Sequence, residues 1–322
     1  MRLVTRADFD GIVCGSLITL MEEIDSYLFV EPKFMQDGMV DIRRGDIIAN
    51  LPYHSDCSLW FDHHVTNKDW PFKTPIVAGK GGFRLAPSAA RVVYEYYEAG
   101  GNRTSASSVE PQQDLGNRNI QEGLKVLGSE RMRYLLEETD RIDAGRLVPE
   151  DVHHPEGYVL ISMTLDGRKT EDEPYWRRLI ELLRDHSLEE TLKNSEVRER
   201  CQQILDAQEK LKEILLKRTA LKGNVIFVDL RGIRDIPDGN RFLLYTLFPA
   251  GNISIKVADD SQRPNTTAIS VGYNIFNTTS KVNVGALLEK HGGGGHKVVG
   301  SCRVPRGEAE KAIREIFEAI KE

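Results

Sequence analysis

Short apolar runs alternate with stretches of helical periodicity over the N-terminal third of the chain. Three of these runs have the length and composition of strands: residues 1–5, Ile47 to Ala49 and Leu59 to Phe61. Ile12 to Met21 and Pro87 to Tyr97 instead predict helices, the second with a proline near its start and a glycine pair past its end. Strands that alternate with helices are typical of a parallel sheet, so we expect an α/β fold.

The middle of the chain is polar and charged. Residues 102–119 are rich in Ser, Asn and Gln and predict a surface loop, and residues 145–173 predict a second loop-rich stretch. Helical periodicity runs from residue 121 toward residue 143. Residues 188–221 carry apolar side chains at near-helical spacing and predict one or two long amphipathic helices. A coiled-coil dimer through this segment is an alternative, although its heptad pattern is imperfect.

The pattern changes after Gly223. Short apolar runs predict strands at Val225 to Val228, Ile253 to Val257 and Ala268 to Val271. A terminal helix is predicted from Glu308 to Lys321. We therefore expect two α/β lobes, an N-terminal parallel-sheet lobe and a smaller C-terminal one. The expected boundaries are an N-terminal domain in 1–190, a helical linker in 191–222 and a C-terminal domain in 223–322.

Length and charge narrow the class of protein. A chain of 322 residues is long enough for two domains, each with its own core. Hydrophobic content of 40% and charged content of 29% fit a globular protein. The net charge of −6 provides no overall basic field for long duplex nucleic acid. A small anionic substrate bound by a local cluster remains compatible with this charge.

Cysteine usage and the N-terminal residues predict a cytoplasmic protein. The four cysteines lie far apart and form no CxxC pair, which argues against a zinc site or a disulfide framework and for reduced thiols. The first residues are too charged for a signal peptide. We expect no membrane segment, because no apolar run approaches the roughly 20 residues that a membrane span needs.

Two carboxylates follow the first predicted strand. Asp8 and Asp10 lie two residues apart beside a glycine turn. In an open α/β sheet the ligand crevice lies at the carboxyl ends of the strands, where each carboxylate can bind one ion of a metal pair. The same residues also fit a solvated acidic turn that caps the next helix. A second polar strand end would favour metal binding.

Such a strand end occurs at Asp62, His63 and His64, which follow the apolar run at residues 59–61. A carboxylate and two imidazoles suit divalent metal binding and phosphate contact. Adjacent strand residues point in opposite directions, so one histidine can ligate a metal while the other reaches a phosphate. We interpret the second His-His pair, at 153–154 in a proline-flanked loop, as surface.

Two further segments offer chemistry. Asp140 and Asp143 lie at a helix end and are candidates for an additional metal carboxylate, although their spacing alone favours a structural role. Four glycines and His296 follow in residues 292–296, and they predict a flexible segment whose N–H groups close around a phosphate. With the polar strand ends, this segment indicates phosphoester chemistry between two lobes.

Four motifs together resemble the DHH phosphoesterase superfamily. They are TRADFDG (5–11), LWFDHH (59–64), ETDRIDAG (138–145) and HGGGGHKVVGS (291–301), in the family's order and over nearly the whole chain. The resemblance is to the branch with a glycine-rich DHH-associated C-terminal domain. That branch includes RecJ-like exonucleases, nano-RNases, cyclic dinucleotide phosphodiesterases and exopolyphosphatase-related proteins.

The resemblance implies a pair of Mn²⁺ or Mg²⁺ ions in a catalytic N-terminal domain and substrate binding by the C-terminal domain. Asp62 would orient His63 as metal-bound histidines usually require, and His64 would contact the substrate phosphate. Arg231 or Arg241 would add a charged contact, with Arg241 preferred. The implied metal ligands are Asp8, Asp10, His63 and Asp140, with Asp143 as the alternative to Asp140, and the implied phosphate-binding residues are Gly293, Gly294, Gly295 and His296.

Two positions depart from the family pattern. Some members carry a histidine four residues before the first aspartate, where this chain has Val4. The family's metal-bridging aspartate, at the end of the strand before the DHH strand, is replaced by Asn50. Asp46 comes too early to serve. A neutral amide oxygen can ligate a metal but offsets no cation charge, so we expect one weak or empty metal site.

The expected function is metal-dependent hydrolysis of short oligonucleotides or other small nucleotide phosphodiesters. An exopolyphosphatase-like hydrolase is an alternative, although a long polyanion would favour a basic track that the C-terminal lobe does not offer. A second alternative is a non-catalytic nucleotide sensor with a degraded metal site at Asn50. Expected partners are a small nucleotide or a short single-stranded oligonucleotide, and a homodimer is compatible with the sequence.

Overall fold

The chain folds into two compact units. The computed structural model describes residues 1–64, 71, 75–77, 79–101, 115–260 and 262–321, so most of the predicted loop at 102–119 lies outside the described residues. The first unit comprises Met1–Leu147 and Glu156–Cys201, and the second comprises Val148–Pro155 and Gln202–Glu322. The division therefore falls inside the long helix α10 (Ser195–Arg218).

A mostly parallel sheet forms the centre of the first unit. Its strands lie in the order β2-β1-β3-β4-β6-β5, and every neighbouring pair is parallel except β5 with β6. The expected α/β fold with a parallel sheet is thus confirmed for this unit. The strands are β1 (Arg2–Thr5), β2 (Ser26–Phe29), β3 (Ile47–Ala49), β4 (Leu59–Asp62), β5 (Ile76–Val77) and β6 (Gly81–Phe83).

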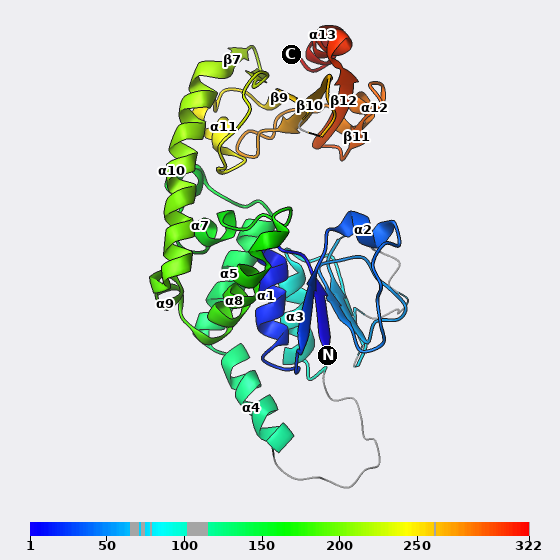
Figure 1. Cartoon of the computed structure of the whole chain (residues 1–322), viewed down its shortest axis with the longest axis vertical. Coiled ribbons are helices and arrows are strands. Elements are labelled where there is room, and N and C mark those ends of the chain that lie inside the picture. The colour runs from blue at the N-terminus through cyan, green and yellow to red at the C-terminus, as the bar shows by residue number, and fades with distance from the viewer. Residues whose placement is uncertain (65–70, 72–74, 78, 102–114, 261, 322) are drawn as a thin grey trace. The chain divides into compact units, whose positions relative to one another are not determined.

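Helices α1 and α3 lie against this sheet, with α5 and α8 outside them (Figure 1). Apolar residues of β1, β3 and β4 are fully buried, which explains why these strands appear as continuous apolar runs in the sequence. The helices of the unit are α1 (Phe9–Ile18), α2 (Pro32–Gln36), α3 (Ala89–Glu98), α4 (Leu115–Leu127), α5 (Glu130–Asp143), α7 (Gly157–Met163), the 3₁₀ turn Thr170–Asp172, α8 (Glu173–Asp185) and α9 (Leu188–Lys193).

The strand order creates a topological switch point. The chain runs from β1 outward to β2 and then returns to the other side of β1 as β3, so connections leave β1 and β3 in opposite directions. In open α/β sheets the ligand crevice forms where this reversal occurs, at the carboxyl ends of the strands. Asp8 follows β1 and Asn50 follows β3, so both lie at this edge.

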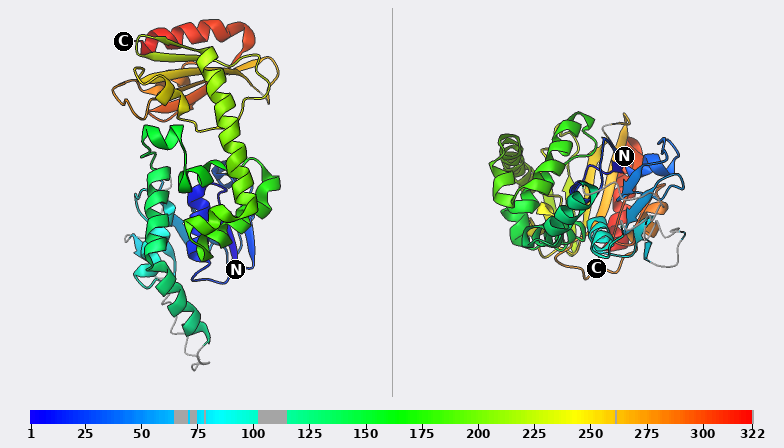
Figure 2. Two further views of the ribbon diagram at one scale, coloured as in Figure 1. Left: turned by 90° about the vertical axis from the view of Figure 1, so that its left-hand side faces the viewer. Right: turned by 90° about the horizontal axis from the view of Figure 1, so that it is seen from below.

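The second unit has a mixed six-stranded sheet in the order β11-β12-β10-β9-β8-β7, in which only β8 and β9 are parallel. Helix α13 packs on one face of this sheet, as Figure 2 shows. The other face packs against α11 and the second half of α10. The elements are α6 (Pro149–His153), β7 (Thr219–Lys222), β8 (Val225–Asp229), α11 (Leu243–Leu247), β9 (Ile253–Asp259), β10 (Thr266–Tyr273), α12 (Val284–Glu289), β11 (Gly294–Gly295), β12 (Val299–Pro305), the 3₁₀ turn Arg306–Glu308 and α13 (Ala309–Ile320).

One prediction about local structure is wrong. Residues 145–173 are not loop-rich, because α6 and α7 lie within them. These helices are short, and Pro149 and Gly157 at their first positions resemble loop residues in the sequence. The predicted helical pattern from residue 121 toward residue 143 is confirmed, and it forms two helices, because Ser129 caps a new helix by accepting a hydrogen bond from the backbone of Met132. No helix in the described part of the chain is long and apolar enough to cross a membrane.

Candidate metal centre

Three potential metal ligands meet at the carboxyl edge of the first sheet. The carboxylates of Asp10 and Asp143 and the imidazole of His63 each offer one ligand atom, and these atoms all lie within 4.8 Å of one another. Nε2 of His63 lies 3.4 Å from Oδ2 of Asp143 and 3.7 Å from Oδ2 of Asp10. These residues come from the first turn of α1, the position directly after β4 and the last turn of α5.

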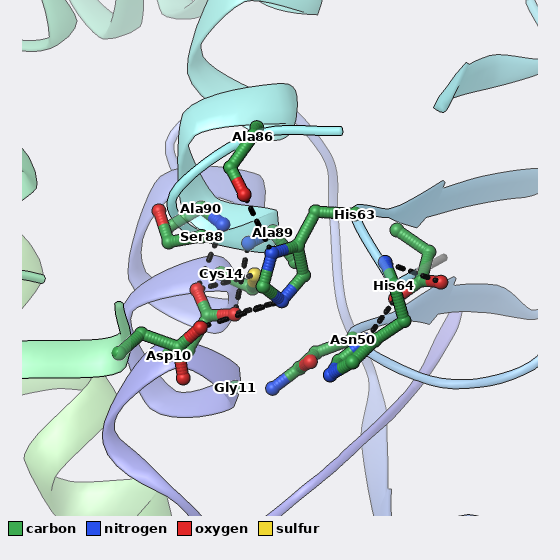
Figure 3. Close-up of polar contacts among 12 residues, drawn as sticks. Asp10, Gly11, Cys14, Asn50, His63, His64, Ala86, Ser88, Ala89 and Ala90 are labelled. Atoms are coloured by element: carbon green, nitrogen blue, oxygen red, sulfur yellow. Dashed lines mark hydrogen bonds and ion pairs between the residues drawn. The ribbon is translucent and has the colours of Figure 1, made fainter. Parts of the chain in front are cut away.

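Asp10 is held in place by the N-terminus of α3 (Figure 3). The backbone amides of Ala89 and Ala90 each donate to its carboxylate at 2.8 Å. The positive end of a helix dipole thus faces a carboxylate that is only 2% exposed. Gly11 permits this turn, because a Cβ there would lie 2.2 Å from the backbone oxygen of Arg6.

The carboxylates of this cluster repel one another. Burial, followed by the negative charges of Asp143 and Asp8, raises the pKa of Asp10 well above its usual range. Burial and the charge of Asp8 also raise the pKa of Asp143. A bound cation would offset both the desolvation and the repulsion.

His63 presents a free lone pair to this cluster. Its Nδ1 lies 2.9 Å from the backbone oxygen of Ala86, which can only accept, so Nδ1 carries the proton in the neutral ring and Nε2 does not. Nε2 is buried and makes no hydrogen bond. An imidazole fixed by a carbonyl, with its other nitrogen facing two carboxylates, fits a divalent metal ligand.

Asp62 orients His64, whereas the resemblance implied that it would orient His63. Oδ1 of Asp62 lies 2.8 Å from Nδ1 of His64, and its Oδ2 accepts from the His64 backbone amide at 3.2 Å. Because adjacent strand residues alternate in direction, the fully buried Asp62 reaches the histidine two positions on. The hydrogen bond to Asp62 raises the pKa of His64.

Asp140 lies outside the group of three ligands. Its Oδ1 accepts from Ser88 Oγ at 2.6 Å, and its Oδ2 accepts from Arg91 Nε at 2.9 Å. Asp140 therefore ties α5 to the start of α3, while Asp143, one turn later, faces His63. The metal role of Asp140 stays a prediction, and the geometry favours Asp143.

Asn50 and Asp8 contact each other across the switch point. Nδ2 of Asn50 donates to Oδ1 of Asp8 at 3.0 Å, and Oδ1 of Asn50 is buried without a hydrogen bond. Asn50 has a φ of 58°, a left-handed conformation that asparagine tolerates better than most residues. Asp46 is engaged elsewhere, by Arg2 at 2.6 Å and the Arg43 amide at 2.8 Å.

Sequence reasoning missed Arg6. Its Nη1 lies 2.8 Å from Oδ2 of Asp8, and its Nη2 lies 3.8 Å from Oε2 of Glu31. The signal was present, because Arg6 directly follows β1 and stands two residues before Asp8. Sequence reasoning predicted a helix start near residue 87 but missed the hydrogen bonds from its amides to Asp10. These bonds join residues at least 79 positions apart, so they leave no local pattern in the sequence.

The glycine segment of the second unit is not a flexible loop. Gly294 and Gly295 form β11, which pairs with Ser301 and Gly300 of β12. A Cβ at Gly295 would lie 2.4 Å from Gly300 Cα, and Gly295 has a φ of 151°. A Cβ at Gly293 would lie 2.3 Å from the Ser301 oxygen, whereas one at Gly294 would meet open space. Close backbone packing therefore requires Gly293 and Gly295.

The other predicted substrate contacts also lie in the second unit. His296 is exposed, and its backbone amide donates to Val299 O at 2.8 Å. The guanidinium of Arg241 stacks on Phe242, 4.6 Å from the ring centre. Arg231, the weaker candidate, is engaged by Asp229 and Glu310 at 2.6 Å each. Substrate binding by His296 and Arg241 remains a prediction.

Comparison with solved structures shows the family. The chain is similar to the pGpG-specific phosphodiesterase PggH from Vibrio cholerae, with 31% identity, a TM-score of 0.78, and coverage of 99% of this chain and 98% of that one. The chain belongs to the DHH phosphoesterase superfamily. The predicted family and the predicted phosphoesterase class are thereby confirmed. No protein-family model matches the chain, and no curated protein matches it.

Two further solved structures share the fold. RecJ in complex with Mn²⁺, from Thermus thermophilus, matches at 14% identity and a TM-score of 0.52, covering 98% of this chain and 51% of that one. A DHH domain from a member of the s1p family of ribosomal proteins matches at 16% identity and a TM-score of 0.51, covering 100% of this chain and 87% of that one. At these identities the likeness is one of fold.

Proposed function

We propose that this protein is a divalent-metal-dependent phosphodiesterase that cleaves short linear oligonucleotides, with the dinucleotide pGpG as the first candidate substrate. The observation that carries the proposal is the unpaired, buried Nε2 of His63, which faces the carboxylates of Asp10 and Asp143. Full-length similarity to a pGpG-specific phosphodiesterase supports the substrate class. A short substrate also suits an acidic protein, because it needs no long basic track.

Asp10, His63 and Asp143 would hold Mn²⁺ or Mg²⁺, the ions present in the RecJ structures from Thermus thermophilus. Bound there, a divalent cation would offset negative charge on the phosphoryl oxygens. The amides at the N-terminus of α3 favour the ionised form of Asp10, against the effect of burial, and orient its carboxylate. The Ala86 carbonyl keeps His63 in the tautomer that ligates.

His64 would act on the phosphate itself. The buried Asp62 fixes its ring through Nδ1 and favours the protonated form, so Nε2–H is available as a donor. The ring centres of His63 and His64 lie 4.2 Å apart, which places this donor beside the ligand histidine. A protonated imidazole there would stabilise charge on a phosphoryl oxygen or deliver a proton to the leaving alkoxide.

The second unit would bind the remainder of the substrate. Backbone N–H groups of the segment Gly293 to Gly295, with the exposed side chain of His296, would contact a phosphate. Gly294 suits a close approach, because no atom lies within 4 Å of the position where its Cβ would be. Arg241 would add a guanidinium for phosphate or base stacking.

A substrate panel with Mn²⁺ tests this function. We expect turnover of pGpG and other dinucleotides, weaker turnover of five-residue oligonucleotides, and little of cyclic dinucleotides or polyphosphate. His63→Ala should abolish turnover and metal-dependent stabilisation, whereas His154→Ala, in the second His-His pair, should change neither, because His154 is mostly exposed. Preferred hydrolysis of polyphosphate would favour the exopolyphosphatase alternative. Tight nucleotide binding without turnover would favour the sensor.

A further inference from the structure

Both oxygens of Asp8 are already engaged by donors of the chain. Oδ1 accepts from the Asn50 amide at 3.0 Å and from the Gly11 backbone at 2.9 Å. Oδ2 pairs with Arg6 Nη1 at 2.8 Å. Asp8 is therefore neutralised by a permanently charged guanidinium. It is not a member of the group of three ligands around His63.

The carboxylates of the three-ligand group differ from Asp8 in this respect. Asp10 accepts from backbone amides, which carry no net charge, and the charges of Asp143 and Asp8 disfavour its ionised form. Asp143 meets an imidazole that is neutral when it ligates. This group needs a cation from solution, whereas Asp8 has one from the chain.

Arg6 is partly buried at this position. Its side chain is 28% exposed, its Nη2 lies 3.8 Å from Glu31 at the start of α2, and its Nε is buried without a hydrogen-bond partner. A metal ion at Asp8 would lie within a few ångströms of this guanidinium. Like charges at that distance repel, and a partly buried site screens this repulsion less than bulk water does. The ion would have to displace Arg6 to bind.

We propose that Arg6 is a built-in second cation that limits the centre to one divalent ion. The ion binds Asp10, His63 and Asp143, and the guanidinium occupies Asp8 where a second ion would otherwise bind. The inference rests on the proposed metal centre and adds the number of ions and the residue that sets it. Asn50 contributes by donating a hydrogen bond to Asp8 where a bridging carboxylate would instead attract a second cation.

The test counts bound Mn²⁺ in the full-length protein after saturation and removal of free metal, and records the Mn²⁺ electron paramagnetic resonance spectrum. Wild type should bind one ion per chain and give the spectrum of an isolated ion. Arg6→Gln removes the charge but keeps a polar side chain, and it should bind two ions with a spin-coupled spectrum. Arg6→Lys retains the charge and should bind one.

Arg43→Gln is the matched control, because it removes an arginine that pairs with Asp41 on the surface, and it should bind one ion. A spin-coupled pair in wild type, or a single ion in folded Arg6→Gln, would overturn the inference and leave the proposed function standing. No ion in wild type would overturn the proposed function as well. The wild-type spectrum decides even if Arg6→Gln does not fold.

Discussion

Asn50 Nδ2 and Asp8 Oδ1 lie 3.0 Å apart and join the ends of β3 and β1 by a hydrogen bond. The two strands are neighbours at the switch point of the sheet, so residues separated by 42 positions meet where a ligand is expected. The amide makes this contact attractive without a metal ion. A carboxylate at position 50 would make it repulsive.

Asn50→Asp should therefore lower the melting temperature of the metal-free protein and tighten Mn²⁺ binding by about tenfold. The stabilisation by Mn²⁺ should converge toward that of wild type at high metal concentration, where mass action fills the single proposed site in both proteins. Thermal melting across a Mn²⁺ titration measures both effects. Asn265→Asp is the control, because Asn265 is also left-handed, with a φ of 59°, but is exposed on the second unit. An unchanged Mn²⁺ affinity in Asn50→Asp would place residue 50 outside the metal centre.

Asp143→Asn and Asp140→Asn should have opposite effects on the metal-free protein. Removing the charge of Asp143 relieves the cost of burying that charge and its repulsion with Asp8. The melting temperature of Asp143→Asn should therefore rise by about 2–4 °C. Asp140→Asn instead breaks the pair with Arg91 and should lower the melting temperature. Only Asp143→Asn should lose most of the stabilisation by Mn²⁺. Loss of that stabilisation in Asp140→Asn alone would make Asp140 the ligand.

The effect of Asp143→Asn should also depend on pH. Because folding raises the pKa of Asp143, its ionised form destabilises the metal-free fold. The difference in stability between variant and wild type should therefore shrink as pH falls through the raised pKa. Melting curves in a chelator from neutral to acidic pH measure this. A difference that grows on acidification would contradict the repulsion.

Asp62→Asn should shift the pH dependence of turnover. Asp62 raises the pKa of His64, so the pair stabilises the fold below the ordinary histidine pKa and loses that contribution as pH rises through the raised value. As pH rises, the fraction of protonated His64 and the kcat should both begin to decline at a lower pH in the variant than in wild type. Proton NMR titration of His64 and a kcat–pH profile test this. Asp56→Asn, beside His54 on the surface, should leave the profile unchanged.

Gly294→Ala and Gly295→Ala separate packing from binding in the second unit. Gly295→Ala should destabilise this unit by about 1–3 kcal/mol, because its Cβ would overlap Gly300. Gly294→Ala should fold normally and raise KM for pGpG if its backbone approaches the phosphate. His296→Ala should likewise raise KM without changing metal content. An unchanged KM in both Gly294→Ala and His296→Ala would remove this segment from the substrate site.

The sequence by itself determined the secondary structure of those segments in which burial produces a continuous run of apolar residues. The apolar runs at β1, β3 and β4 are buried on both faces of a sheet, so they are visible without any partner. The motifs with Asp10, His63 and Asp143, together with the glycine-rich motif at residues 291–301, carried the resemblance to the superfamily, because all of them occur in the family's order. Short helices such as α6 and α7 were missed, since Pro149 and Gly157 resemble loop residues.

Only the tertiary structure decided which polar groups face one another. Asp140 and Asp143 are one helical turn apart and look equivalent in the sequence, yet Arg91 pairs with the first and His63 faces the second. Asn50 reaches Asp8, which also pairs with Arg6, because β3 returns to lie beside β1 in the sheet. Local patterns record burial and helix periodicity, whereas charge pairing depends on the order in which distant strands assemble, and a linear pattern does not encode that order.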